Sequence, residues 1–123
     1  MISLLTRFSF PKVPGDQMWS VVDVTGPASY VDVTPGSPGP PLVPPTGGQQ
    51  LLPQDFGLQM LLFVSAMASF DGLFSVVAIP QPANDGSLDR VILQWIDLST
   101  GAEVAAGTDL SASTVRVFCE LGY

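Results

Sequence analysis

The stretch Asn84–Leu98, NDGSLDRVILQWIDL, decides the fold of this 123-residue chain. It begins with a strong hairpin-turn signal, because Asn, Asp and Gly tolerate the positive φ angles that tight turns require. The residues after the turn alternate as in a strand, and Val91, Leu93 and Trp95 share one face of that strand. The other face mixes polar and apolar side chains, which suits a strand covered by another sheet or another subunit. Trp95 is therefore expected in the core.

Turn signals and alternating apolar residues predict further strands on both sides of this stretch. The expected strands are Met18–Val24, Tyr30–Val33, Leu58–Ala68, Leu73–Ile79, Leu88–Leu98, Ala102–Ala106 and Thr114–Leu121. No window of a dozen residues keeps a helical period bounded by caps, so an all-β chain is expected. Short turns between so many strands predict a small antiparallel β-sandwich or barrel, built as one domain over residues 1–123.

Three parts of this pattern carry more specific expectations. Leu58–Ala68 is apolar almost throughout, as in a strand buried on both faces, and a short buried helix is the rival interpretation. Pro80 and Pro82 are expected to close the strand before them, since proline cannot donate to a ladder. Ala102–Ala106 is expected to be a short edge strand.

A long proline-rich segment interrupts the strands. Thr34–Gln50 reads TPGSPGPPLVPPTGGQQ and holds six prolines and four glycines. Each proline fixes its own φ, removes a backbone donor and restricts the residue before it, which excludes a helix or a central strand. We therefore expect residues 34–53 to form a long extended arm or loop that runs over a surface. A disordered linker and a ligand for an aromatic groove are alternative interpretations of the same composition.

The arm also supplies most of the residues expected to bind a partner. Leu42 and Val43 lie between two proline pairs and are expected to act as apolar pegs, because proline stiffness lowers the entropy lost on docking. Tyr123, the last residue, is expected to anchor the chain end in a neighbour. The expected partner-binding residues are Pro40, Pro41, Leu42, Val43, Pro44, Pro45 and Tyr123.

The composition is poor in charge. Charged residues make up 12% of the chain and apolar residues 46%, whereas an average soluble domain has about 25% charged residues. A monomer with so few charges and so much apolar surface is hard to keep soluble. We therefore expect part of the surface to be buried against other chains.

The sequence argues against two classes of partner, nucleic acid and a lipid bilayer. Eleven acidic and four basic residues give a net charge of −7, and the basic ones are scattered along the sequence. Direct nucleic-acid binding is not expected, because it needs a basic patch. Leu58–Ile79 is long enough to span a bilayer, but Asp71 and Gly72 interrupt it. A strand, a turn and a second strand explain this break better than a membrane span does.

Catalytic chemistry has few candidates. Histidine is absent, which removes the commonest general base, the usual serine and cysteine triads and most zinc sites. Cys119 is the single cysteine, so no internal disulfide can form, and its apolar alternating neighbours predict a buried thiol. We expect no enzyme activity, no metal and no cofactor.

Two pairs of carboxylates remain as an acid and a base: Asp85 with Asp89, and Asp97 with Glu103. Both pairs flank turns, where aspartates ordinarily bond to the local backbone or face solvent. Asn84–Asp89 also offers oxygen ligands around a glycine, but its spacing does not fit an EF-hand calcium loop. A small enzyme that uses only carboxylates stays open as an alternative.

Four segments carry a family resemblance: Ile92-Leu93-Gln94-Trp95, Gly101-Ala102-Glu103-Val104, Gly107-Thr108-Asp109-Leu110-Ser111 and Val115-Arg116-Val117. In this style of short strand and turn, the chain from about Leu58 onward resembles small structural proteins of tailed-bacteriophage virions. It looks like a capsid decoration or cement protein. The resemblance implies a non-enzymatic module on the capsid surface of the virion, a dimer or trimer that bridges subunits of the shell. Its implied partners are the major capsid protein or other virion subunits, and no individual functional residue is carried over.

The main alternative is a phage tail or fibre module, or another β module, that binds carbohydrate. Aromatic side chains stack on sugars, so exposed Trp19 and Tyr30 would form the binding face in that case.

Overall fold

The structure is a computed structural model that describes residues 2–9, 17–55, 60–82 and 87–122, with residues 2–9, 17–20, 60, 121 and 122 described by their backbone alone. This part of the chain contains strands and no helix. The strands are β1 (Ile2–Ser9), β2 (Gln17–Thr25), β3 (Gln49–Leu51), β4 (Met60–Ser69), β5 (Phe74–Pro82), β6 (Leu88–Asp97) and β7 (Thr114–Gly122).

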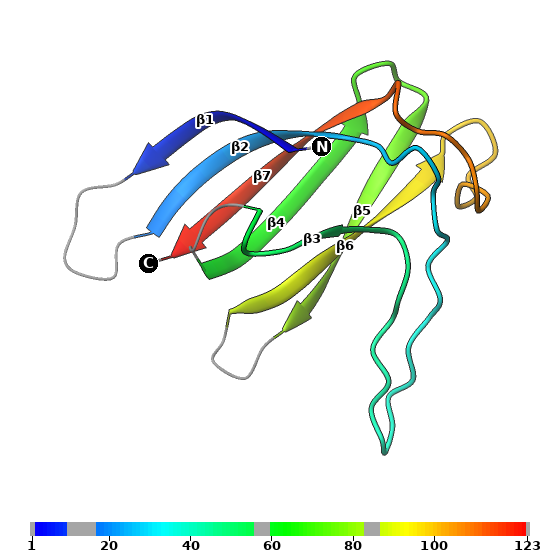
Figure 1. Cartoon of the computed structure of the whole chain (residues 1–123), viewed down its shortest axis with the longest axis horizontal. Helices are drawn as coiled ribbons and strands as arrows, with labels where there is room; N and C mark the ends of the chain where they lie inside the picture. The colour runs from blue at the N-terminus through cyan, green and yellow to red at the C-terminus, as the bar shows by residue number, and fades with distance from the viewer. Residues whose placement is uncertain (1, 10–16, 56–59, 83–86, 123) are drawn as a thin grey trace.

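The strands form one antiparallel sheet that curls into a half-barrel, which confirms the all-β expectation (Figure 1). The strand order is β1-β2-β7-β4-β6-β3, and β5 pairs with β6. β2 and β7 lie far apart in sequence, yet they pair along their whole length, from Gln17 opposite Gly122 to Thr25 opposite Thr114. Irregular register in β1 and β4, and in β6 where Asp89 has no partner opposite it on β5, marks bulges, and bulges bend strands and increase their twist.

The inner face of the half-barrel holds the hydrophobic core. Its largest fully buried side chains are Trp95, Tyr30, Leu51, Leu61, Leu93 and Leu110. The edge of Phe74 packs against the Trp95 ring, with 5.8 Å between the centroids. Cys119 is also fully buried in this cluster. The expectations for Trp95 and Cys119 are confirmed, and each large side chain buried this way contributes about 1.5–3 kcal/mol.

The loop that contains Tyr30 closes one end of the core through a buried hydrogen-bond network. The Tyr30 hydroxyl donates to Oε2 of Glu103 at 2.8 Å and accepts the backbone N–H of Trp95 at 3.2 Å. The same Glu103 oxygen accepts the N–H of Val33 at 2.7 Å. This network ties the loop to β6, so the phenol serves the fold and is only 1% exposed.

Most of the expected strands are present, and two strands were not expected. Those expected at Met18–Val24, Leu58–Ala68, Leu73–Ile79, Leu88–Leu98 and Thr114–Leu121 correspond to β2, β4, β5, β6 and β7, with shifted ends. β1 and β3 have no counterpart in the sequence interpretation. The turn expected at Asn84–Ser87 lies mostly outside the described residues.

Two expected strands are wrong. Tyr30–Val33 is not a strand: Tyr30 exchanges backbone hydrogen bonds with a turn, donating to Thr108 at 2.9 Å and accepting from Gly107 at 2.7 Å. Ala102–Ala106 forms only an isolated bridge between Glu103 and Ile96. In both places the backbone partner is a turn or a single residue, so no ladder can extend.

The expectation that Pro80 and Pro82 end the fifth strand is also wrong. β5 runs through Pro82, with Pro80 opposite Val91 and Pro82 opposite Leu88 after a bulge. A strand with a ladder on one side tolerates prolines whose missing N–H groups point away from that ladder. In the described part of the sheet, β6 is the strand that pairs with β5.

β4 is not buried on both faces. Leu61 is fully buried, whereas Phe63 is 48% and Met67 56% exposed. Val64 and Ala66 pack against the core between them. The run is apolar on its outer face as well as on its inner face, and that outer face lies open.

The proline-rich segment folds back on itself. We call residues 34–46 the finger; it projects from the sheet in Figure 1. Its two limbs are joined by bridges between Thr34 and Thr46 and between Ser37 and Val43, through backbone hydrogen bonds of 2.7–3.1 Å. Gly39, near the tip, has a φ of 81°, a left-handed value that strongly favours glycine.

The long extended arm expected for residues 34–53 is therefore not confirmed. Prolines remove most of the donors that a regular ladder needs, so the limbs pair only at residues that keep an N–H. The end of the expected arm belongs to the domain itself, because Gln49–Leu51 forms β3 and Leu51 is fully buried. The segment thus combines an exposed finger with a core strand.

Candidate interaction surface

The outer face of the half-barrel carries an apolar surface over β7 and β4. Phe63 and Met67 on β4 alternate with inward side chains, and Ser65 between them lies opposite Phe118 of β7. Phe70 follows β4 directly. We define the outer-face patch as Phe63, Met67, Phe70 and Phe118, which are 48%, 56%, 58% and 41% exposed. Clustered exposure of large apolar side chains is typical of an interaction surface.

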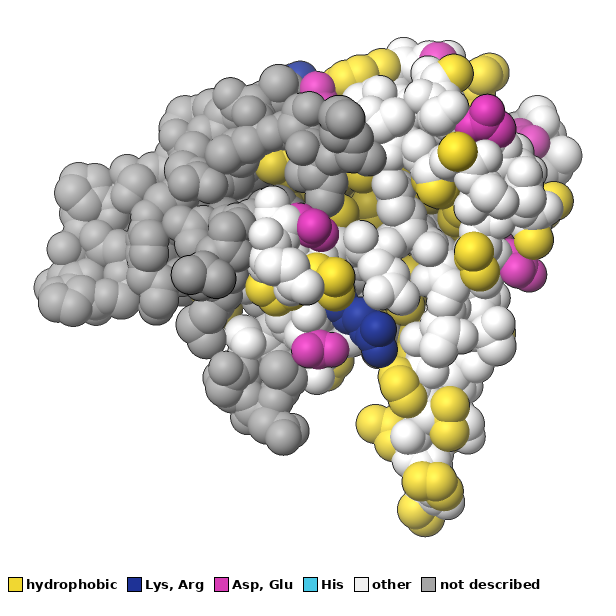
Figure 2. Space-filling view, in the orientation of Figure 1, with side chains coloured by type: hydrophobic (Ala, Val, Ile, Leu, Met, Phe, Trp, Pro, Cys, Tyr) yellow, Lys and Arg dark blue, Asp and Glu magenta, His cyan; other side chains and the backbone are white. Residues whose placement is uncertain are grey.

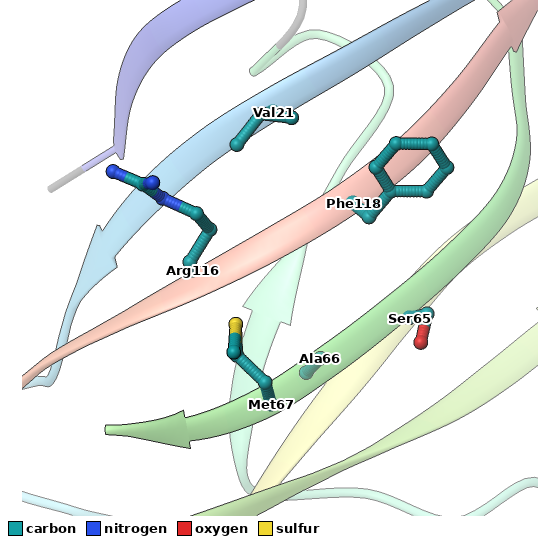
Figure 3. Close-up of a pocket in the computed structure, with 6 residues that line it drawn as sticks. All are labelled: Val21, Ser65, Ala66, Met67, Arg116 and Phe118. Carbon is teal, nitrogen blue, oxygen red and sulfur yellow. The ribbon is translucent and has the colours of Figure 1, made fainter. Parts of the chain in front are cut away.

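A shallow groove of about 220 Å³ crosses this patch (Figure 3). It runs over three neighbouring strands, β2, β7 and β4. The side chains that line it are Val21, Ser65, Ala66, Met67, Arg116 and Phe118. In Figure 3 the Met67 and Phe118 side chains stand on the same side of the sheet as Arg116. The groove is smaller than the roughly 300–1,000 Å³ of ordinary small-molecule sites.

Arg116 gives the groove one polar, positively charged wall. Its Nε donates to Oδ1 of Asp23 at 3.1 Å, across the β2–β7 pair. Its guanidinium carbon lies 5.2 Å from the centre of the Phe70 ring, in a cation–π contact. These two contacts fix the guanidinium beside the aromatic rings, while 42% of the side chain stays exposed.

The finger is a second exposed apolar surface. Leu42 is 73% and Val43 50% exposed, and apolar side chains cover the projecting tip in Figure 2. The predicted binding residues Pro40, Pro41, Leu42, Val43, Pro44 and Pro45 all lie on this finger. Tyr123 lies outside the described residues. That these residues bind a partner stays a prediction.

The finger lies beside the C-terminal end of β5. A hollow of about 380 Å³ separates its limbs from this strand, and Ile79 to Pro82 form the far wall. Both sides of the hollow are rich in proline. The hollow lies between the finger, including Leu42 and Val43, and the end of β5, while the tip of the finger projects.

Two of the four carboxylates considered as acid and base, Asp97 and Glu103, accept structural hydrogen bonds. Asp97 Oδ1 accepts the N–H and the hydroxyl of Ser99, at 2.9 and 2.7 Å. Glu103 accepts from Tyr30 and Val33. Asp89 is exposed, with 3.9 Å between its Oδ2 and Nε of Arg90, and Asp85 lies outside the described residues. These contacts fit the interpretation of turn aspartates that bond locally.

Asp71 is a further carboxylate with a structural role. One of its oxygens accepts the Ser69 hydroxyl at 2.6 Å and the Leu73 N–H at 3.1 Å, and the other accepts the Ser113 hydroxyl at 2.7 Å. The hydroxyls of Ser69 and Ser113, in that order, lower the pKa of Asp71. The carboxylate thus joins the β4–β5 turn to the loop before β7.

Other chemical features do not form a second site. Among the described residues, no group of three or more Cys, Asp and Glu is placed to hold a metal ion. Burial raises the pKa of the Cys119 thiol to about 12, so the thiol stays protonated at neutral pH. In the part of the chain that the structure covers, no helix is long and apolar enough to cross a bilayer.

The expected aromatic pair for carbohydrate is not assembled. Tyr30 is buried with its hydroxyl bonded to Glu103, so it is not the exposed platform that sugar stacking needs. The Trp19 side chain lies outside the described side chains. The exposed Tyr30 that the carbohydrate-binding alternative would need is therefore not present, because the loop of Tyr30 packs into the core.

The outer-face patch was missed by the sequence interpretation. A period-two pattern was present: Phe63, Ser65 and Met67 share one face of their strand. The almost wholly apolar run around them was taken as buried on both sides, which hid that pattern. Phe118 stands between Arg116 and Glu120 on the outward side of β7, and it was overlooked because its neighbours on that face are charged.

The comparisons with known proteins add no relative. No protein-family model, no curated protein and no solved structure matches the chain significantly. The fold and the surface define the class: an all-β half-barrel with an exposed apolar outer face and a projecting proline-rich finger.

Proposed function

We propose that this protein is a non-enzymatic structural subunit of a virion, a decoration or cement protein that binds the outside of a capsid shell and bridges its subunits. One observation carries the proposal: two separate surfaces, the outer-face patch and the finger, expose large apolar side chains on a chain with few charges. The choice of a virion among possible assemblies rests on the resemblance of the second half of the chain to phage decoration proteins.

Weak contacts are sufficient for such a role. An apolar side chain moved from water into an interface contributes about 1.5–3 kcal/mol before the cost of association. A subunit with two separate apolar surfaces can touch two neighbours at once, and linked contacts raise the overall affinity without any single strong one. The proline-rich finger loses little conformational entropy when it docks.

The occupied carboxylates favour this role over an enzyme of the carboxylate type. Asp97 and Glu103 bond to different partners and close different parts of the fold. Asp97 lines a hollow of about 470 Å³ together with Leu73, Leu98 and Ser99, and this hollow has no second carboxylate in its lining. A pair of carboxylates within reach of one substrate is the minimum that this chemistry needs.

The test is to purify particles of the phage whose genome encodes the chain and to quantify the protein against the shell subunit by mass spectrometry. We expect a fixed ratio between the two, and we expect purified protein to bind again to particles stripped of it. Absence from the particles, with the protein present in the soluble fraction of the lysate, would contradict the proposal.

A further inference from the structure

We propose that the finger of one copy docks in the outer-face groove of a second copy, so that the protein self-associates head to tail. The inference goes beyond the proposed function, because it concerns contacts between copies and does not depend on which shell they cover. It rests on two complementary surfaces of one chain that the fold keeps apart.

The finger is an uncharged ligand rich in hydrogen-bond acceptors. No charged residue occurs between Asp32 and Asp55. Its prolines keep their carbonyl oxygens but have no N–H, so the finger offers more acceptors than donors. Leu42 and Val43 add two apolar side chains at the projecting end, where both are at least half exposed.

The groove has the complementary chemistry. Met67 and Phe118 supply apolar walls, and the ring of Phe70 lies just beyond them against Arg116. A guanidinium carries five N–H donors, and the contact of Arg116 with Asp23 uses Nε. The structure therefore sets donors beside aromatic rings, the combination with which proteins bind proline-rich segments.

Charge favours the finger over a symmetric packing of two outer faces. Each copy carries a net charge of −7, and two outer faces in contact would bring together the Glu120 carboxylates of both copies, whereas each Asp23 is already paired with Arg116 at 3.1 Å. Like charges near one another in an interface oppose association. The uncharged finger lets a second copy reach the positive wall at Arg116 without adding acidic groups.

The finger does not fill the groove of its own chain. Its limbs lie beside Ile79 to Pro82 at the end of β5, whereas the groove crosses β2, β7 and β4. In Figure 1 the tip projects away from those three strands. Contact between finger and groove therefore joins two copies, and such a heterologous contact builds rings or open chains.

The test is sedimentation velocity on three variants of the full chain and on wild type. Leu42→Glu blocks the finger, Met67→Glu blocks the groove, and Leu98→Glu makes the same charge change at an exposed site outside both surfaces. We expect wild type and Leu98→Glu to associate as concentration rises. Each of the other variants alone should associate about tenfold or more weakly, because an apolar anchor at an interface is replaced by a charge.

An equimolar mixture of Leu42→Glu and Met67→Glu distinguishes the contact proposed here from a symmetric one. The intact finger of the groove variant meets the intact groove of the finger variant, so the mixture should form heterodimers with an affinity close to that of wild type, although each variant alone associates about tenfold or more weakly. Circular dichroism of each variant confirms that it is folded. Self-association of Leu42→Glu as strong as that of wild type, a mixture that associates no better than either variant alone, or a wild type that stays monomeric would each overturn the inference. No particles are present, so this outcome is independent of the test of virion binding.

Discussion

The indole Nε1 of Trp95 donates a hydrogen bond of 3.0 Å to Oε1 of Gln49. The other end of the same amide, Nε2 of Gln49, donates to the backbone carbonyl of Thr25 at 2.7 Å. One glutamine of β3 therefore links the central tryptophan of β6 to the end of β2. β3 is only three residues long, and this side chain explains how so short a strand helps to close the half-barrel.

We expect Gln49→Ala to destabilise the protein by about 1–3 kcal/mol, because the indole N–H and the Thr25 carbonyl lose their partner in a buried region. Gln50→Ala is the matched control: Gln50 is the next residue of β3, is exposed, and should change stability by less than about 0.5 kcal/mol. Urea unfolding followed by tryptophan fluorescence measures both. Equal midpoints for the two variants would show that the link carries no stability.

The Tyr30 network predicts a loss of stability at high pH. Burial raises the pKa of the Tyr30 hydroxyl far above its usual value of 10.0, and the Glu103 carboxylate raises it further. A group whose pKa is raised in the folded state contributes its full stability below the unfolded pKa and loses it as the pH rises beyond. The contribution of Tyr30 to the free energy of unfolding should therefore be level up to about pH 10 and fall above it.

Tyr30→Phe should remove part of this alkaline decline and cost about 1–3 kcal/mol at neutral pH, since Glu103 and the Trp95 N–H lose a partner. The measurement is denaturant unfolding from pH 7 to pH 11, performed with Cys119→Ala in both proteins because burial also raises the pKa of that thiol, to about 12. If the free energy of unfolding falls equally steeply above about pH 10 with and without the Tyr30 hydroxyl, Tyr30 is not the group responsible for the alkaline loss of stability.

The hydrogen bonds of Asp71 predict how the stability of the protein changes in acid. The Ser69 and Ser113 hydroxyls and the Leu73 N–H lower its pKa. A lowered pKa contributes stability above the unfolded value, near 3.9, and this stability is lost as the pH falls through the folded value. Asp71→Asn should therefore lower the melting temperature at pH 7 and reduce the sensitivity to acid below about pH 4. The exposed Asp89→Asn is the control, and melting curves identical to this control would contradict the role of Asp71.

The structure of the finger predicts that a short deletion within it and a longer deletion that includes part of β3 have different effects on stability. Replacing residues 35–45 by two glycines should leave the melting temperature nearly unchanged and weaken attachment to particles, because the finger tip is exposed while the bridge from Thr34 to Thr46 can still close. Deleting Thr34–Gln50 should unfold the domain, because it also removes Gln49 and most of β3. Thermal melts and particle occupancy measure both effects. Full occupancy with the short deletion would show that the finger is not a binding element.

Much of the fold follows from local pattern. The alternation around Trp95 and Cys119 places both in the core, since a strand with one apolar face can bury only that face. Turn aspartates such as Asp97 bond to residues two positions on, as their short side chains allow. These features depend on neighbours in sequence.

Features that depend on distant contacts were not predictable. The local sequence predicts a strand at Tyr30. In the structure its hydroxyl instead donates a hydrogen bond to Glu103, which is 73 positions away and cannot be inferred from the local pattern. Gln49 belongs to the proline-rich segment by composition but to the core by its hydrogen bonds. The exposed outer face of β4 was interpreted as a second buried face, because an exposed apolar residue looks in sequence like one that faces a core.

The most direct test of the central proposal, that the protein is a structural subunit on a capsid shell, is an electron cryomicroscopy map of the virus particles with which it is proposed to assemble. The account predicts density for the half-barrel on the outside of the shell, repeated at equivalent lattice positions. A shell with no such density at a resolution that shows its strands would contradict it.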